Sequence, residues 1–439
     1  HDIRTPMNAI VGMTAIAGAH IDQKERVQDC LSKITQASRH LLGLINEILD
    51  MSRIESGRFT LSEEDFNLSD MIDNLVVMNQ PEIKAHHHTF SIHLDGVQHE
   101  KVYGDNLRLQ QLMTNLLSNS IKYTPDGGHI SLSISEIPQH TPGSSCFKFI
   151  IEDDGIGMSE EFQKVLFEPF TRADDKRTSQ IQGTGLGMAI SRNIARMMNG
   201  DIEVESDLGK GTKFIITVSL RLQEDEQEPL EELIHLPVLV VDDDPMSCEN
   251  TVELLQDIGV DGESVTSGKA AIQKTLEKQK QNDHYFAIII DWQMPGMDGI
   301  ETARRIRQIV GPDVTIIILS AYDFSEIEDL AREAGVNEFI AKPLFRSRLV
   351  SLLKNLATGK DTALPKETTL SAFSNISLPG KRFLLVEDNM LNSEIAAEIL
   401  HMTGAEVDTA ENGQEALHKF LYHPVGHYDL IFMDIQMPL

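Results

Sequence analysis

Asp153-Asp154-Gly155-Ile156-Gly157 follows the apolar run Phe149-Ile150-Ile151, and this stretch decides the fold of the middle of the chain. The apolar run predicts a strand, and a carboxylate at its end can accept a hydrogen bond from an adenine amino group. The two glycines let backbone and base approach closely because they carry no side chain. The stretch indicates a nucleotide pocket, although an aspartate beside glycines also occurs in ordinary turns.

Two further motifs flank this stretch. Asn115 and Asn119 are one helical turn apart and share a face, with Lys122 on an adjoining part of it. Amide oxygens there can hold Mg²⁺, and the lysine can meet phosphate oxygens. Gly183-Thr184-Gly185-Leu186-Gly187 leads into a predicted helix, whose free amides and positive end can cradle phosphates. Each motif is weak alone, but the ordered set is much more specific than any one of them.

The surrounding sequence alternates between strand and helix periodicity. Alternating apolar residues predict strands over 90–94, 130–134, 147–151 and 214–220, and helical patterns cover 68–85, 106–123 and 188–198. These elements predict an antiparallel or mixed sheet covered on one face by helices. His86, His87 and His88 are consecutive and cannot face one metal ion, so we expect a solvated loop before a strand.

His1-Asp2-Ile3-Arg4-Thr5-Pro6 opens the chain, and alone it is compatible with an ordinary polar helix surface. Seven-residue apolar repeats over 3–21 and 27–48 predict two helices packed along one seam. In this register His1 faces solvent, and Asp2 can accept the proton of one ring nitrogen so that the other can attack phosphorus. Pro6 is expected to bend the helix beside His1.

The apolar seam is too large for two helices to bury. A four-helix bundle formed by two chains is therefore the expected solution, and a helical subdomain within one chain is the alternative.

A second kind of site is predicted after the acidic segment Gln223–Glu232. Strands predicted over 238–241, 287–290, 315–319 and 338–341 alternate with helices, which indicates a doubly wound parallel sheet. Functional groups collect at the carboxyl ends of such strands, and the residues found there are Asp242, Asp243, Asp291, Ser320 and Lys342. Helix capping alone would not explain all five positions.

These five residues suit phosphoryl transfer. The three carboxylates can bind one Mg²⁺, which leaves Asp291 to attack a phosphoryl group whose charge the metal and Lys342 offset. The Ser320 hydroxyl can donate a hydrogen bond to the resulting acyl phosphate.

The same pattern begins again after a linker rich in Thr, Ser, Lys and Pro. Glu387 and Asp388 end one predicted strand, and Asp434 ends another. Asp243 and Asp291 are 48 residues apart, and Asp388 and Asp434 are 46 apart, which indicates an internal repeat. The second copy stops before the positions that would match Ser320 and Lys342. Half of a parallel sheet should not be stable alone.

The motifs together resemble those of hybrid sensor histidine kinases. The opening hexapeptide resembles the H box. The Asn pair, the two glycine motifs and Phe167-Glu168-Pro169-Phe170 resemble the N, G1, G2 and F boxes of the Bergerat-type ATP fold. Histidine kinases share that fold with heat-shock-90-type chaperones and type II topoisomerases. The repeated carboxylate pattern resembles response-regulator receiver domains, with Phe339 at the family's aromatic switch position.

The resemblance implies roles for individual residues. Asp153 would read adenine, Asn115 and Asn119 would bind Mg²⁺ and phosphate, and residues 171–182 would form a mobile lid in which Arg172 touches the transferred phosphate. His1, Asp291 and Asp434 would be phosphorylated. Metal ligands in the second receiver would be Glu387 and Asp388.

The implied architecture is multidomain. A phosphoacceptor hairpin at 1–58 precedes an α/β sandwich ATP-binding domain at 59–222. An acidic linker at 223–236 leads to a flavodoxin-like first receiver at 237–357. A linker at 358–380 precedes an incomplete second receiver at 381–439. The implied enzyme is an ATP-dependent protein-histidine kinase that phosphorylates His1 and passes the group to Asp291, with Asp434 as a further candidate acceptor.

Composition limits the partners. Lys and Arg total 38 against 68 Asp and Glu, and a net charge of −30 argues against direct nucleic-acid binding. Three separated cysteines suggest neither disulfides nor zinc and suit the cytoplasm. We expect a fragment cut at both ends, whose parent is anchored in the inner membrane by a missing sensor region. Its further partner would be a histidine phosphotransfer domain or a response regulator.

Two other classes of function fit parts of the sequence. An ATP-driven conformational machine would hydrolyse ATP without labelling the protein, and a degenerate scaffold would bind nucleotide or partners without transfer.

Overall fold

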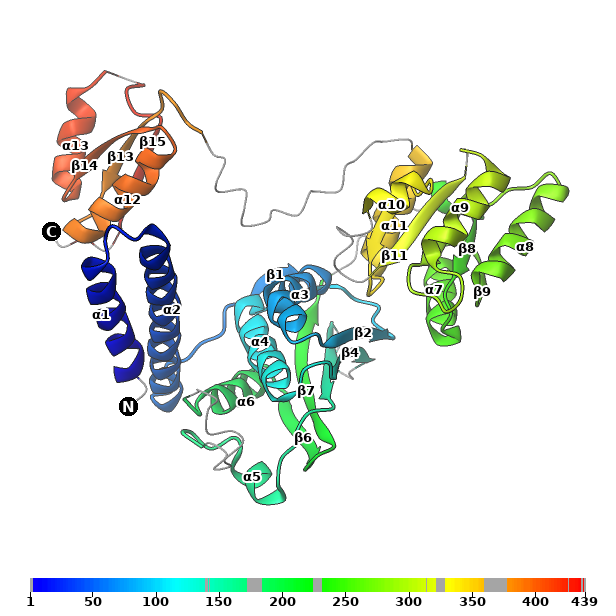
Figure 1. Ribbon diagram of the computed structural model, residues 1–439, viewed down its shortest axis with the longest axis horizontal. Coiled ribbons are helices and arrows are strands. Elements are labelled where there is room, and N and C mark those ends of the chain that lie inside the picture. Colours follow the sequence, from blue (N-terminus) through cyan, green and yellow to red (C-terminus); the bar gives the residue numbers. More distant parts are fainter. Residues whose placement is uncertain are drawn as a thin grey trace. The chain divides into compact units, whose positions relative to one another are not determined.

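A computed structural model describes residues 3–138, 141, 143–171, 184–223, 231–312, 314–320, 328–358, 377–424, 426–435 and 437. The chain forms two compact units, His1–Lys360 and Asp361–Leu439 (Figure 1). The first unit contains a helical hairpin, an α/β domain with a mixed sheet, and a domain with a parallel sheet.

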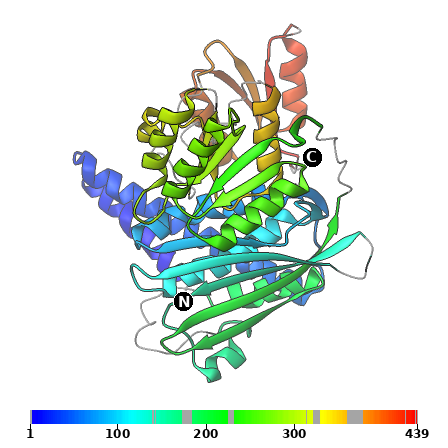
Figure 2. The same ribbon diagram turned by 90° about the vertical axis from the view of Figure 1, so that its right-hand side faces the viewer.

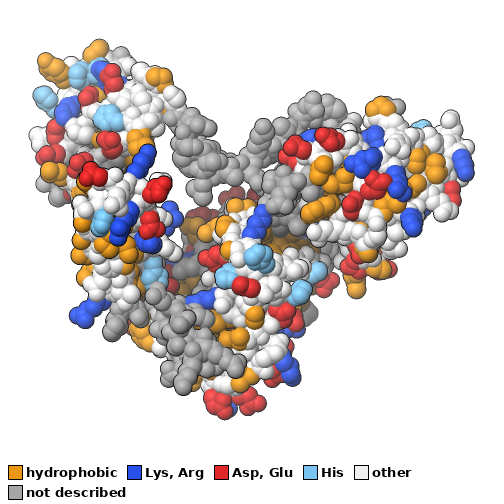
Figure 3. Space-filling view, viewed as in Figure 1, with side chains coloured by type: hydrophobic (Ala, Val, Ile, Leu, Met, Phe, Trp, Pro, Cys, Tyr) orange, Lys and Arg blue, Asp and Glu red, His pale blue; other side chains and the backbone are white. Residues whose placement is uncertain are grey.

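The hairpin consists of α1 (Arg4–Ala19) and α2 (Lys24–Glu55), which pack against each other. Pro6 lies in the first turn of α1, where its missing amide removes no helical hydrogen bond. The bend predicted beside His1 falls outside the described residues. Several residues of the predicted seam are exposed in the single chain, among them Ile21 at 75% and Leu31 at 54%. Hydrophobic side chains accordingly run along the hairpin surface (Figure 3).

The α/β domain is built on a seven-stranded sheet in the order β1-β3-β7-β5-β4-β2, with β6 also paired to β7. Only the β2–β4 pair is parallel among the described strands of this sheet. The strands are β1 (Glu64–Asn67), β2 (Thr89–Asp95), β3 (Lys101–Gly104), β4 (His129–Pro138), β5 (Ser144–Asp153), β6 (Asp201–Asp207) and β7 (Gly211–Leu222). The mixed sheet that the sequence predicts is confirmed.

Helices cover one face of this sheet. They are α3 (Leu68–Ala85), α4 (Asn106–Tyr123) and α6 (Gly187–Met197), and the short α5 (Glu160–Val165) lies at the edge (Figures 1 and 2). Residues of β5 and β7 alternate between fully and partly buried, because one face of each strand packs beneath the helices. The bounds predicted for α3 and α4 agree with the structure. The strands β1 and β3 are not predicted from the sequence, because strands of four residues are too short to show a clear alternation of apolar residues.

The expectation of a solvated loop at His86–His88 is wrong for His88. That side chain is 8% exposed, and its Nε2 lies 3.1 Å from the carbonyl oxygen of Ile121. His86 remains near the surface and pairs with Asp126 at 2.8 Å. The buried His88 therefore connects the segment after α3 to α4 through this contact.

The first receiver has a five-stranded parallel sheet in the order β12-β11-β10-β8-β9. Its strands are β8 (Pro237–Val241), β9 (Asp261–Val265), β10 (Ala287–Asp291), β11 (Thr315–Ser320) and β12 (Glu338–Ala341). Its helices are α7 (Pro245–Asp257), α8 (Gly268–Lys280), α9 (Gly299–Val310), α10 (Glu328–Glu333) and α11 (Arg346–Thr358). One hydrophobic cluster packs on each face of the sheet. The short 3-10 helix Glu231–Leu233 contributes the fully buried Leu233 to one of them, so packing begins within the predicted linker 223–236.

The second unit repeats the first half of this fold. It contains β13 (Arg382–Val386), α12 (Met390–Met402), β14 (Glu406–Ala410), α13 (Gly413–Tyr422) and β15 (Leu430–Met433). The parallel order β14-β13-β15 corresponds to β9-β8-β10 of the first receiver. All four residues of β15 are exposed, so an apolar strand lies open at the sheet edge. The predicted instability of this half sheet stays a prediction.

Among the described residues, no helix combines the length and the apolar character needed to cross a membrane. Cys30, Cys146 and Cys248 form no disulfide with one another.

Candidate functional site

Asp153 lies at the end of β5 and is 6% exposed. One carboxylate oxygen, Oδ1, accepts hydrogen bonds from the amides of Gly155 and Thr212 at 3.0 and 3.2 Å. The other oxygen, Oδ2, accepts the hydroxyl of Ser120 at 2.8 Å. Burial raises the pKa of Asp153, although these hydrogen bonds oppose the shift. The geometry fixes a buried acceptor that suits the amino group of a purine.

The glycines around Asp153 leave space that any side chain would fill. A Cβ on Gly157, where φ is +65°, would lie 1.9 Å from the carbonyl oxygen of Asp207. At Gly155 the added atom would lie 2.7 Å from Asp153 itself. Only glycine therefore fits these turns, because a side chain would collide with neighbouring parts of the same domain. The predicted close approach of a base to these glycines stays a prediction.

The second glycine motif meets the predicted Asn pair. Gly187 begins α6, and a Cβ there would lie 2.6 Å from Oδ1 of Asn115. The amide nitrogen of Asn115 donates to the hydroxyl of Ser191 at 2.8 Å, while Asn119 contacts the sulfur of Met188. The start of α6 and the middle of α4 are thus adjacent, as a phosphate and metal site between them requires. At the end of the same face, Lys122 is exposed.

Four predicted site residues lie outside the described residues: His1, Asp2, Arg172 and Gly183. Of the expected lid over 171–182, only Thr171 is described. Gly185, with φ of +73°, is described, and its Cβ position lies 2.7 Å from the carbonyl oxygen of Thr171.

Ionic contacts hold α6, and with it the second glycine motif, against the sheet. Arg192 donates to Asp201 at 2.8 Å, and its guanidinium lies 4.5 Å from the centre of the Phe167 ring. Arg196 reaches the same carboxylate at 3.3 Å. Phe167 belongs to the predicted F motif, so Arg192 connects that motif to α6.

Asp201 should contribute a small, pH-dependent stabilisation. Partial burial opposes its ionisation, but the hydrogen bonds, chiefly from Arg192, lower its pKa to about 2. The contribution is complete above the usual value of 3.8 and is lost as pH falls toward 2. We expect Asp201→Asn to lower the free energy of unfolding by about 0.5–1 kcal/mol at pH 7, since the pair is partly exposed. Urea denaturation at pH 7 and near pH 3 measures this.

The control for this prediction is Asp207→Asn, whose carboxylate is exposed and pairs with Lys210 at 3.0 Å. A loss for Asp201→Asn that stays equal at both pH values would contradict the ionic explanation.

Sequence reasoning missed the contacts between α2 and the predicted nucleotide-binding domain. Asp50 of α2 is 6% exposed and accepts from Arg108 at 2.7 Å and Gln111 at 3.2 Å, both on α4. Three residues earlier, Glu47 accepts the hydroxyl of Thr184, inside the second glycine motif. The only available signal was two acidic residues on one helical face near the end of an apolar repeat. These contacts connect the hairpin to α4 and to the second glycine motif of the predicted nucleotide site.

The first receiver brings its predicted residues together at the carboxyl ends of β8, β10 and β12. Lys342 Nζ lies 2.9 Å from Asp242 and 3.0 Å from Asp291. Burial lowers the pKa of Lys342, but the two carboxylates outweigh burial and the pKa ends above its usual value. The lysine is therefore a fixed positive charge between two acids.

The carboxylates fit a divalent cation. Oxygens of Asp242, Asp243 and Asp291 lie within 4.8 Å of one another. Burial raises the pKa of Asp291, and the neighbouring Lys342 only partly offsets this. Three acids against one lysine leave an excess of negative charge, which suits the oxygen coordination of Mg²⁺. The hydroxyl of Ser320 is buried and has no hydrogen-bond partner among the residues that the structure describes, so it is available to an added group.

Mg²⁺ should stabilise this receiver. At concentrations about 10 to 100 times its dissociation constant, we expect a gain of about 1.4–2.7 kcal/mol in unfolding free energy. Asp242→Asn should remove most of the gain, because Asp242 would be a ligand, whereas Asp257→Asn at the exposed end of α7 should not. Calorimetry of the receiver transition without nucleotide measures the effect. An equal gain in Asp242→Asn would place the ion elsewhere.

The second unit contains a similar acidic cluster. Oxygens of Glu387, Asp388 and Asp434 lie within 4.8 Å of one another, at the ends of β13 and β15. Glu387 and Asp434 are less buried than Asp242 and Asp291, because fewer strands and helices surround them, and Asp388 is exposed like Asp243.

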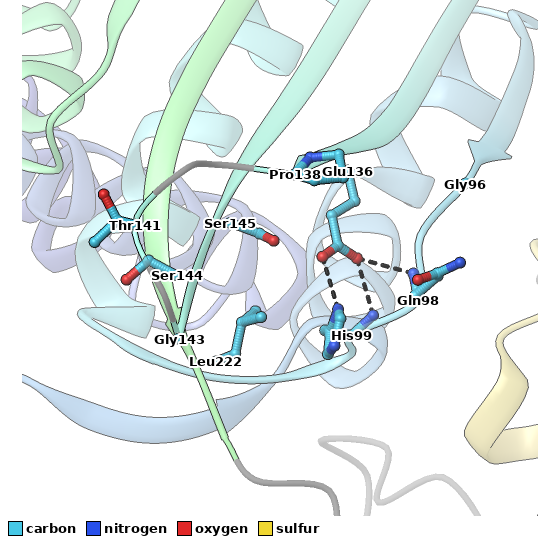
Figure 4. A pocket seen from close by; sticks show the side chains of 10 residues that line it. All are labelled: Gly96, Gln98, His99, Glu136, Pro138, Thr141, Gly143, Ser144, Ser145 and Leu222. Carbon is cyan, nitrogen blue, oxygen red and sulfur yellow. Dashed lines mark hydrogen bonds and ion pairs between the residues drawn. The ribbon is translucent and has the colours of Figure 1, made fainter.

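A separate cavity of about 350 Å³ lies at the other end of β5 from Asp153 (Figure 4). Glu136 points into this region, and its carboxylate accepts from the His99 ring at 2.7 Å and from the amides of Gln98 and His99 at 2.9 Å. Its lining contains none of the predicted nucleotide-site residues.

Three protein families match successive parts of the chain. The His Kinase A (phospho-acceptor) domain matches residues 1–57. The histidine kinase-, DNA gyrase B-, and HSP90-like ATPase matches residues 104–222. The response regulator receiver domain matches residues 238–354 and 383–439. The order is that of a kinase followed by two receivers.

The chain is similar to curated sensor kinases. Over its whole length the chain is 29% identical to the sensor histidine kinase GacS of Pseudomonas protegens, and it spans 47% of that protein. Over 80% of the chain it is 31% identical to the autoinducer 2 sensor kinase/phosphatase LuxQ of Vibrio vulnificus, of which it spans 41%. The chain thus covers less than half the length of these relatives.

The fold is also that of a solved structure, full-length ShkA in complex with AMPPNP. The TM-score is 0.56 at 21% sequence identity, and the match covers 100% of this chain and 86% of that one. The domains, their order and the relatives define a signalling kinase of the two-component class. The chain belongs to the hybrid histidine kinases, with one complete receiver and part of another.

Proposed function

We propose that His1 takes the γ-phosphoryl group of ATP and that Asp291 then takes it from His1. The observation that carries this proposal is the presence, in one chain, of a buried acceptor at Asp153 and a lysine-bridged carboxylate cluster at Asp291. The first suits the donor nucleotide, and the second suits an acceptor for phosphoryl groups.

Both steps are substitutions at phosphorus. A ring nitrogen of His1 forms a bond to the γ-phosphorus as the bond to the bridging oxygen breaks and ADP leaves. Asp2 holds the proton on the other ring nitrogen. A carboxylate oxygen of Asp291 then bonds to phosphorus as the phosphorus–nitrogen bond breaks, and the imidazole leaves. Lys342 offsets the transferred charge and Ser320 donates a hydrogen bond to it.

Divalent metal belongs to the same proposal. Mg²⁺ would be held by Asn115 and Asn119 at the nucleotide, and by Asp242, Asp243 and Asp291 in the receiver. It supplies charge neutralisation at phosphoryl oxygens. The orphaned hydroxyl of Ser320 and the acidic cluster support this assignment.

We infer that the chain dimerises through α1 and α2, because the exposed apolar seam needs a second surface. A monomeric mass in light scattering would contradict this. Asp434 is a further candidate acceptor for the group on His1, and a histidine phosphotransfer domain or a separate response regulator would be the terminal acceptor. The chain would be the cytoplasmic part of a kinase that a sensor region anchors in the inner membrane.

Labelling with γ-labelled ATP and Mg²⁺ tests the proposal. The chain should take up label, His1→Gln should take up none, and His40→Gln, an exposed histidine on α2, should behave as the parent. ATP hydrolysis without labelling would favour a conformational machine, and ATP binding without either would favour a scaffold.

A further inference from the structure

The first receiver contacts the ATP-binding domain through the segment that follows Lys342. Phe345, directly before α11, is 1% exposed and packs in the hydrophobic cluster of the ATP-binding domain. Leu349 and Leu353, one and two turns further along α11, pack in the receiver cluster instead. This short segment therefore joins the cores of two domains.

Glu100, from the loop before β3, lies at the N-terminal end of α11. Its carboxylate accepts a hydrogen bond from the amide of Ser347 at 3.1 Å and another from the Ser347 hydroxyl. The first amides of a helix have no partner within the helix and carry partial positive charge, which favours a carboxylate there. Glu100 is 8% exposed, and burial raises its pKa. The contact thus excludes water.

An ion pair completes the contact. Arg348 of α11 pairs with Asp73 of α3, and its guanidinium lies 5.9 Å from the centre of the Phe345 ring. The side chains of the pair are 24% and 29% exposed. A buried aromatic anchor with polar pairs around it has the composition of a specific interface.

We propose that this surface of the ATP-binding domain is a regulated docking site for the first receiver of the same chain. Docking is favoured while Asp291 is unphosphorylated, and phosphorylation of Asp291 weakens it. This regulation rests on the proposed function, because it requires Asp291 to be the acceptor.

The connection runs through Lys342. Its ammonium group bridges Asp242 and Asp291, and Phe345 follows only three residues later. Phosphorylation replaces the single negative charge of the Asp291 carboxylate by the roughly two negative charges of an acyl phosphate, a net gain of about one. Lys342 follows the new charge, and the segment anchored at Phe345 is displaced. Because such coupling is reciprocal, loss of docking also favours the phosphorylated form of Asp291.

Hydrogen exchange of the full chain tests the docking. For each substitution, exchange is measured in the domain on the other side of the contact. Phe345→Ala should speed exchange by about tenfold in residues 68–75 of α3. Glu100→Arg places a positive charge against the N-terminus of α11. It should speed hydrogen exchange in residues 346–353 of the receiver. Ser351→Ala, an exposed position on α11, is the matched control and should change neither. Unchanged exchange across the contact in both variants would overturn the proposal.

Beryllium fluoride with Mg²⁺, an analogue of the phosphoryl group, tests the regulation without ATP or His1. It should speed exchange over 68–75 in the parent chain but not in Asp291→Asn, and Phe345→Ala should bind it about fivefold more tightly. Binding at Asp291 that leaves exchange over 68–75 unchanged would overturn the regulation and leave the proposed function standing. If the receiver binds no beryllium fluoride, both the proposed regulation and the proposed role of Asp291 as phosphoryl acceptor would be overturned.

Discussion

Asp153→Asn is expected to weaken ATP binding by about 100-fold, or about 2.7 kcal/mol, while the domain stays folded. Two amides donate to Oδ1, so the amide oxygen of the new Asn should take that place. The new NH₂ group then occupies the position of Oδ2, where it can donate to the hydroxyl of Ser120. A purine amino group would meet a donor instead of an acceptor, and a site built for a hydrogen bond rejects such a mismatch strongly.

Calorimetric titration with ATP measures this effect. The matched control is Asp154→Asn, which changes the neighbouring exposed carboxylate, a partner of His129. It should bind ATP as the parent chain does. An Asp153→Asn protein that keeps its affinity within about fivefold would show that Asp153 does not read the base.

Asp291→Asn is expected to increase the label held on the chain as phosphohistidine by about tenfold, because an amide is not a nucleophile for phosphorus. The substitution leaves Lys342 its contact with Asp242, so the receiver should stay folded. It also removes one of the crowded negative charges in the cluster. Quantified gel labelling after a fixed time with ATP measures the effect.

Asp257→Asn at the end of α7 is the control for this substitution. A further variant, Asp291→Asn with Asp434→Asn, separates the two receivers. If only the double variant accumulates label, Asp434 is an acceptor in its own right. A fall in label for Asp291→Asn would contradict the direction of transfer.

Simple rules of strand and helix geometry explain why the sequence alone can bring some of the site residues together. Asp242 and Asp291 lie at the ends of the neighbouring parallel strands β8 and β10, and Lys342 follows β12, which is separated from β10 by β11. The carboxyl ends of parallel strands meet at one edge of the sheet. Asn115 and Asn119 are one turn apart on a helix, so their common face follows from helix geometry alone. Local rules therefore place these residues without knowledge of the whole fold.

The contacts between domains could not be predicted in this way. Glu47 and Thr184 are 137 positions apart, and Glu100 and Ser347 are 247 apart. No period relates such positions, and each pair depends on how complete domains pack against each other. Phe345 shows the same limit, because an apolar residue at the start of a receiver helix would be expected in the receiver core, yet it packs in the other domain.

The chemical stability of the label on Asp291→Asn tests the central claim most directly. The proposed transfer from His1 to Asp291 predicts a label that acid removes and base leaves intact, and that disappears entirely when His1→Gln is added. A label that survives acid, or one that persists in the His1→Gln protein, would contradict phosphorylation of His1 as the first step.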